Sequence, residues 1–311
     1  MKTKTTILPL AVAGLLGATV ATSMAATTSL SSGNWQGGAW SAGQPGAGDD
    51  AVINGSVNAA GVVDAWSGTL TVDSTGTLNV SSTTGDFNAL SGAGTVFMNG
   101  GTILNNWKSQ TVASNFALSG GGTFDISGNS AWNQDQVFSG VFSGTGGLSF
   151  KGGNHQGMTF TNTNTFTGGL TFTDQNQRYG VGLGAAGATG LGDVTVTATS
   201  ATGQSALLVL QANDVFAPAA TINLNGAGFA NSSGGFGPFA GYLRTNFNID
   251  MQGFDATVAA VNLNGTPIAP GNYTSANAAW LGGTGTLSVI PEPSTGILVG
   301  LAGLGLLRRR R

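Results

Sequence analysis

The chain has 311 residues, including 53 glycines and only 8 prolines, and 7% of its residues are charged. Between the two termini, twelve aspartates are accompanied by only four cations, Lys108, Lys151, Arg178 and Arg244. This balance argues against a nucleic-acid partner, which needs clustered lysine and arginine, and the absence of cysteine excludes disulfides.

Residues 1–25 have the order of a secretory signal peptide. Lys2 and Lys4 supply a positively charged start, and an apolar run follows over residues 7–20. Small residues then stand at the positions that signal peptidase reads, so we predict cleavage after Ala25 and signal peptidase as a partner. The alternative is an N-terminal helix that is buried in the fold.

Residues 26–290 form the body, which we predict to be one domain in which a short unit recurs. In each copy a glycine, often followed by threonine, opens an alternation of apolar and polar residues. This alternation has the period of a β-strand with one buried face. The copies are Gly68–Val72, Gly76–Val80, Gly94–Met98, Gly122–Ile126, Gly147–Phe150, Gly169–Phe172, Gly192–Val196 and Gly285–Val289.

The spacing of the copies predicts how the units are arranged. Gly101, Gly122, Gly147, Gly169 and Gly192 follow one another at intervals of 21 to 25 residues. A period in this range indicates one supersecondary unit stacked on copies of itself, because a unit with a single apolar face can bury it only by stacking. We therefore predict an all-β fold, a right-handed parallel β-helix or β-solenoid. A β-sandwich with irregularly spaced strands is the alternative.

The two ends of the body depart from this regularity. The pattern weakens after about Ala198, although residues 219–224 and 256–261 still alternate. Trp35 and Trp40 lie ahead of the first repeats. Because the end of a solenoid must be covered, we expect the segment with these tryptophans to form a lid.

Two neighbouring segments resemble a known repeat. Residues 138–151 contain Gly-Thr-Gly-Gly-Leu, and residues 164–172 read Asn-Thr-Phe-Thr-Gly-Gly-Leu-Thr-Phe. They are similar to the autotransporter-associated β-strand repeat, where a G-x-G-G-L stretch precedes an N-T-Y-T-G-G-T stretch. Phe166 stands where tyrosine is usual, and Leu170 where threonine is usual. The resemblance implies a right-handed β-helix displayed at a surface, without enzymatic activity.

Few residues of the body offer catalytic or metal-binding chemistry. His155 is the only histidine, so a two-histidine metal site is impossible and a Ser-His-Asp triad would have to be built on it. Its neighbours are glycine, asparagine and glutamine, which predicts a solvated turn. We predict no catalytic residue, no metal and no cofactor, and hence a protein that is not an enzyme.

Paired aspartates are the alternative source of enzymatic chemistry, since polysaccharide-cleaving β-helices use carboxylates on adjacent rungs. Asp49 and Asp50 are sequence neighbours that would point to opposite faces in a strand, so we expect them in a loop or an N-terminal turn. Asp125 alternates with apolar residues and is predicted on a solvent face, while Asp135 and Asp174 are predicted near rung corners. The alternative function is therefore a carbohydrate-binding or polysaccharide-cleaving β-helix, with extracellular polysaccharide as its partner.

The last segment, residues 291–311, combines three parts in order. Pro291, Glu292 and Pro293 are followed by an apolar run over residues 296–307 and then by four arginines. This order closely resembles the PEP-CTERM sorting domain, which implies recognition by an exosortase, a membrane transpeptidase-like enzyme, and cleavage near the Pro-Glu-Pro motif. The arginines are Arg308, Arg309, Arg310 and Arg311.

The tail also predicts a position in the membrane. Its arginines are expected to stay in the cytoplasm, which puts the body across the inner membrane. The uncharged run over residues 294–307 is 14 residues long, shorter than the ~20 that a full span needs, so we predict a short helix that acts as a transient tether. The whole pattern predicts an exported, non-enzymatic protein of the cell surface or extracellular matrix.

Overall fold

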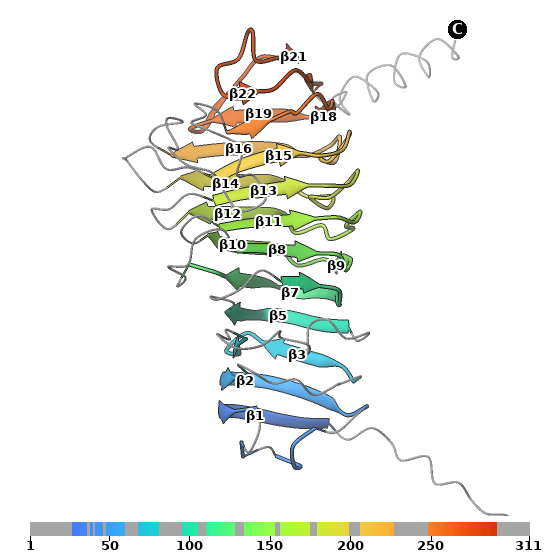
Figure 1. Ribbon diagram of the computed structural model, residues 1–311, viewed down its shortest axis with the longest axis vertical. Helices are drawn as coiled ribbons and strands as arrows, with labels where there is room; N and C mark the ends of the chain where they lie inside the picture. Colours follow the sequence, from blue (N-terminus) through green and yellow to red (C-terminus); the bar gives the residue numbers. More distant parts are fainter. Residues whose placement is uncertain are drawn as a thin grey trace, which may run out of the picture.

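The computed structural model describes residues 27–35, 38–39, 41–45, 48–59, 68–80, 95–104, 110–127, 134–152, 156–174, 179–198, 206–226 and 248–290. Within these ranges all regular secondary structure is β-strand. The strands lie in successive layers along one long axis, with the N-terminal strands at one end and the C-terminal strands at the other (Figure 1). This is the predicted β-solenoid and not the alternative β-sandwich.

One wall of the solenoid is a thirteen-stranded sheet. Its strands are β1 (Thr27–Asn34), β2 (Asp50–Asn58), β3 (Leu70–Asp73), β4 (Thr77–Asn79), β5 (Thr95–Leu104), β7 (Asn115–Asp125), β9 (Phe142–Gly144), β10 (Leu148–Gly152), β12 (Leu170–Asp174), β14 (Val194–Ala198), β16 (Thr221–Gly226), β19 (Ala260–Leu263) and β20 (Thr266–Pro267). The main path runs β1-β2-β3-β5-β7-β10-β12-β14-β16-β19-β20, and all pairs from β1 to β19 are parallel. Continuous parallel pairing is what a repeated coil produces.

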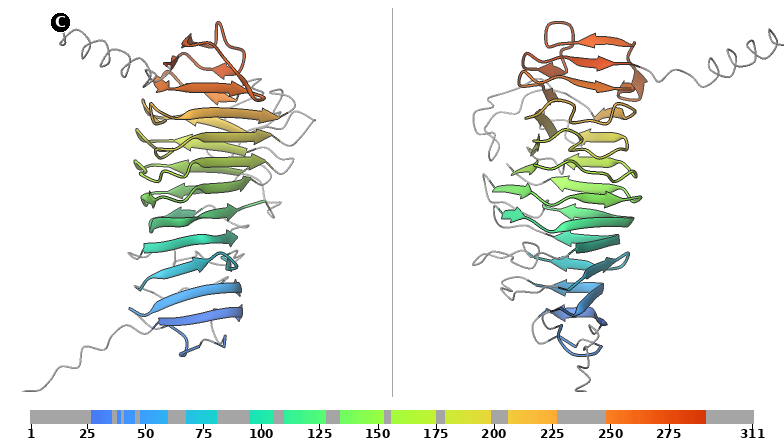
Figure 2. Two further views of the ribbon diagram at one scale, coloured as in Figure 1. Left: turned by 180° about the vertical axis from the view of Figure 1, so that it is seen from behind. Right: turned by 90° about the vertical axis from the view of Figure 1, so that its right-hand side faces the viewer.

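A second wall is a seven-stranded parallel sheet. Its strands are β6 (Gln110–Val112), β8 (Gln134–Phe138), β11 (Gln156–Phe160), β13 (Tyr179–Leu183), β15 (Ala206–Leu210), β17 (Ile249–Asp250) and β22 (Leu281–Gly282). From β10 to β17 the chain alternates between the two sheets, so each turn adds one strand to each wall. Figure 2 shows this stacking from behind and from the side.

Phenylalanines fill the middle of the core in columns that run along the rod. Phe150 stacks between Phe124 and Phe172, with ring centroids 5.3 and 5.7 Å apart. Phe138 and Phe160 form a second stack at 5.4 Å, and Phe160 meets Phe150 edge to face at an interplanar angle of 77°. All five rings are buried. Because offset stacking and edge contacts are both favourable, the columns join neighbouring rungs as well as the two walls.

The register of the strands confirms the predicted inward and outward faces. Leu148 pairs with Leu170, and each side chain is 1% exposed. Ser149 pairs with Thr171 on the outer face, where both side chains are half-buried. Adjacent residues of one strand therefore stand in opposite environments.

At the N-terminal end, part of the free edge of β1 is covered by the segment around Ser41. The amide of Ser41 donates to the carbonyl of Ser29 at 3.0 Å, and the amide of Ser29 donates to the Ser41 hydroxyl at 2.9 Å. Trp35 is buried in the core cluster. Part of the segment predicted as a lid therefore covers this end, whereas Trp35 belongs to the core and Trp40 lies outside the described residues.

At the C-terminal end, strands leave the parallel pattern. β20 turns back antiparallel on β19. A separate three-stranded sheet, which we call the cap sheet, consists of β18 (Ala256–Val258), β23 (Leu287–Val289) and β21 (Gly271–Tyr273). β23 lies between parallel β18 and antiparallel β21. The unit predicted at residues 285–289 is therefore a strand, but it belongs to the cap sheet and not to a further rung.

Candidate functional site

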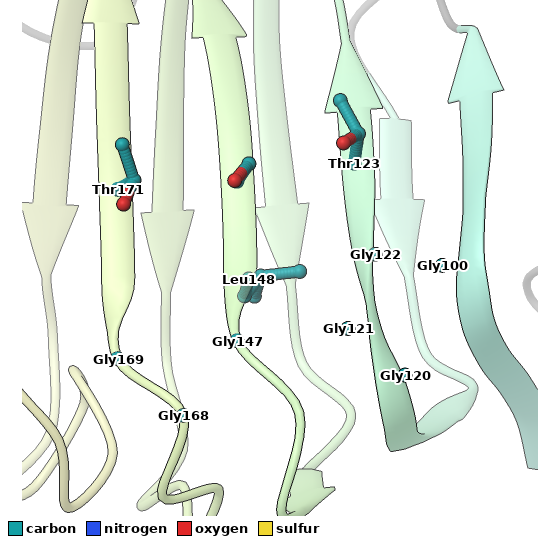
Figure 3. Close-up of a pocket in the computed structure, with 11 residues that line it drawn as sticks. Gly100, Gly120, Gly121, Gly122, Thr123, Gly147, Leu148, Gly168, Gly169 and Thr171 are labelled. Carbon is teal, nitrogen blue, oxygen red and sulfur yellow. The ribbon is translucent and has the colours of Figure 1, made fainter. Parts of the chain in front are cut away.

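The surface is hollowed where the repeats begin on β7, β10 and β12. The hollow has a volume of about 320 Å³, and its lining consists mainly of glycines with Thr123, Ser149 and Thr171 beside them. Figure 3 shows Gly147 and Gly169 directly before β10 and β12 and Gly120, Gly121 and Gly122 within β7, with the labelled Thr123 and Thr171 farther along the same strands. We call this hollow the glycine groove.

The glycines are required because backbones of successive turns pack directly against each other. A Cβ on Gly168 would overlap the backbone of Gly146 and Gly147, and a Cβ on Gly146 would overlap the backbone of Gly121. Gly121 and Gly169 also have φ values of +84° and +87°, which side-chain-bearing residues rarely adopt. The Gly-Gly pairs of the repeat thus follow from stacking and leave a floor of bare peptide groups.

A row of small polar side chains, which we call the polar ladder, runs along the outer face of the thirteen-stranded sheet. It begins at Ser32 and ends at Asn262, and each member pairs in register with the next. Thr123, Ser149 and Thr171 are its members in the glycine groove. Since parallel strands lie about 4.8 Å apart, the ladder presents a hydroxyl or amide at that interval.

Sequence reasoning did not single out the polar ladder as a site. The available signal was the middle residue of the repeating alternation, which is serine or threonine in Gly147–Phe150, Gly169–Phe172 and Gly192–Val196. Each such residue is ordinary on its own. Only the strand register shows that these hydroxyls form one continuous row.

Asp125 lies on the outer face, as predicted, but it does not meet another carboxylate there. Its neighbour on the adjacent strand β10 is Lys151, and the Lys151 Nζ lies 3.7 Å from the Asp125 Oδ2. Asp125 also accepts hydrogen bonds from the Ser127 amide at 3.0 Å and the Ser127 hydroxyl at 2.6 Å. These contacts give this carboxylate a structural role.

Other aspartates bind backbone donors between turns. Asp49 precedes β2, but Asp50, expected in a loop or turn, is the first residue of that strand. Asp50 accepts hydrogen bonds from the amide, at 3.0 Å, and the hydroxyl of Thr69. Asp193 accepts one from the Thr221 amide at 2.8 Å. Among the described residues, no three histidine, cysteine, aspartate or glutamate side chains gather as a metal site requires.

Several predicted residues fall outside the described ranges. They are Ala25, His155, Pro291, Glu292, Pro293, Arg308, Arg309, Arg310 and Arg311, together with the side chains of Asp135 and Asp174. The same holds for the predicted tethering helix. In the described ranges, no helix is long and apolar enough to cross a membrane.

The residue that precedes the Pro-Glu-Pro motif is part of the fold. The amide of Ile290 donates to the carbonyl of Val258 at 2.9 Å, and the Ile290 side chain is 60% exposed. Val289, one residue earlier, is buried in the core cluster. The folded body therefore continues to Ile290 and meets the motif without a spacer.

Comparison with known proteins assigns the tail. Residues 289–311 match the PEP-CTERM protein-sorting motif. No curated protein and no solved structure matches the chain, and no family match supports the resemblance to the autotransporter-associated repeat. The motif indicates an exported, envelope-associated protein that an exosortase-type enzyme processes.

Proposed function

We propose that the chain is a non-enzymatic rod of the cell surface or extracellular matrix, in which the solenoid serves as an extended spacer or adhesive body. The observation that supports this role most directly is the junction at Ile290, where a stacked rod ends and a sorting motif begins. Asp50 and Asp193, at or just before the starts of β2 and β14, accept hydrogen bonds from backbone amides of other turns. Aspartates that connect turns of the solenoid in this way are consistent with a structural role for the body.

Export and tethering would follow from the two termini. The signal peptide directs the chain through the inner membrane and is removed after Ala25. The arginines at residues 308–311 resist translocation because moving each charge through hydrocarbon is costly. The apolar run over residues 296–307 then holds the body as a membrane-tethered intermediate, with the Pro-Glu-Pro motif at the outer face. Cleavage near this motif releases the body to the surface or the matrix.

Processing of the tail can be tested by the mass of the mature protein in cells with and without the exosortase. With the enzyme present, we expect a released body that lacks the segment ending at Leu307. Without the enzyme, we expect the full tail to remain and the protein to stay in the membrane fraction. A mature protein that keeps Leu307 and stays in the membrane when the enzyme is present would contradict processing.

A second candidate function is the binding of extracellular polysaccharide along the glycine groove. The observation that favours it is the polar ladder, because Thr123, Ser149 and Thr171 place hydroxyls at regular intervals beside bare peptide groups. Sugars present hydroxyls that can pair with such donors and acceptors. In this role the rod would hold a polymer without cleaving it.

A polysaccharide panel tests this second function with the mature body. If the groove binds, we expect saturable binding without product, weakened about tenfold when the double variant T123V/T171V removes two hydroxyls. T71V, an outward threonine on β3 away from the groove, is the matched control. Absence of binding would contradict the second function, and the spacer role would be the remaining proposal. Product formation that is lost on aspartate substitution would instead show an enzyme.

A further inference from the structure

The sorting motif and the fold share two residues. The family match begins at Val289, whereas the cap sheet includes Val289 and its backbone pairing extends to Ile290. These residues therefore have two possible partners, the cap sheet and the processing enzyme. Any competition between these two partners rests on the proposed processing of the tail.

In the folded body, β23 has no free edge. On one side Val289 pairs with Val258 of β18, and on the other side it pairs with Gly271 of β21. The Ser288 hydroxyl donates to the Asn272 side-chain carbonyl at 2.9 Å. Val289 is 3% exposed. Neither the backbone nor the buried side chain of this residue is accessible while the cap sheet is formed.

Enzymes that recognise a peptide as an extended strand pair with its backbone and place alternate side chains in pockets. An enzyme cannot bind β23 in this way unless the strand leaves the cap sheet, because both of its edges are already paired. We propose that formation of the cap sheet competes with processing: the enzyme engages Val289 and Ile290 only when β23 has separated from β18 and β21.

If the two partners compete, the stability of the cap sheet determines how fast the enzyme releases the body. When only a fraction of molecules is competent to bind, apparent affinity falls by that fraction. Local opening of a terminal element costs less free energy than global unfolding, so the cap can open while the rod remains folded. A weaker cap should therefore be processed faster, provided that the sorting motif itself is unchanged.

The test compares two Val→Ala variants by pulse-chase conversion of the tethered chain to the released body. Val258, opposite Val289 in the cap sheet, and Val194, on β14 in the rod, are both fully buried. We expect V258A to raise the release rate by up to about tenfold. V194A, which removes the same atoms from the rod, should be released at the wild-type rate. Equal rates for both variants would overturn the proposal.

An insertion can move the residues that the enzyme recognises out of the cap sheet while the cap sheet itself stays intact. Placing Gly-Ser-Gly-Ser-Val-Ile between Ile290 and Pro291 provides a second Val-Ile pair ahead of the motif, outside the sheet. We expect fast release from this variant, and no further gain when V258A is added to it. An unchanged or slower rate would overturn the proposal. If no variant is released at all, the processing function itself fails, which is distinct from failure of the competition.

Discussion

Replacing Leu170 with aspartate is expected to destabilise the body by more than about 4 kcal/mol, whereas the same replacement at Thr171 should cost about 1 kcal/mol or less. Leu170 is 1% exposed and pairs with Leu148 on one side and Val194 on the other. A carboxylate there would be buried without a partner, which is among the costliest of substitutions. Thr171 faces outward in the polar ladder.

Urea denaturation of the purified mature body, followed by its β-sheet circular dichroism signal, measures this difference. The Thr171 variant is the matched control because it introduces the same charge one residue away in the same strand. L148D and S149D repeat the comparison on β10. Equal stability of the two variants in each pair would show that the assigned inward and outward faces are wrong.

Replacing Gly168 with alanine is expected to destabilise the body by about 3 kcal/mol, since a methyl group there would overlap the backbone of Gly146 and Gly147. No flexible side chain is available to move aside, so adjacent turns would have to separate. G265A is the control: Gly265 has a positive φ, of +77°, but a Cβ there meets nothing within 4 Å.

The two variants separate the cost of a steric overlap from the cost of a positive φ, because Gly168 has no positive φ and a Cβ on Gly265 would meet no neighbour. A positive φ alone costs a side-chain-bearing residue roughly 1 to 2 kcal/mol, and this is all we expect for G265A. Thermal or urea unfolding of the two variants gives the comparison. If G168A were as stable as G265A, the direct packing of backbones in the glycine groove would be contradicted.

The first wall of the solenoid was predictable because its strands have one buried and one outer face. The units at residues 147–150, 169–172 and 192–196 overlap the first three residues of β10, β12 and β14. The second wall gave no comparable signal. In β15, Leu208, Val209 and Leu210 are all buried, so the polar alternation is missing. Strands of this kind are recognisable only through their parallel partners.

The two candidate sites differ in the same way. The sorting tail is defined by the order of Pro-Glu-Pro, apolar residues and arginines, so the sequence alone identifies it. The glycine groove depends on which residues of different turns become neighbours. The strand at Leu287–Val289 shows the limit of local patterns: alternation predicts its inward face, but not its antiparallel partner β21.

Both ends of the rod carry structure that opposes the stacking of a further parallel turn, so the number of turns in the chain sets the length of one molecule. At one end the segment around Ser41 occupies part of the β1 edge, and at the other end the antiparallel strands β20 and β21 interrupt parallel addition. Exposed parallel edges would invite open-ended growth of copies into fibres. Duplicating or deleting one internal turn would instead lengthen or shorten the molecule by about 4.8 Å, and the structures at both ends would stay in place.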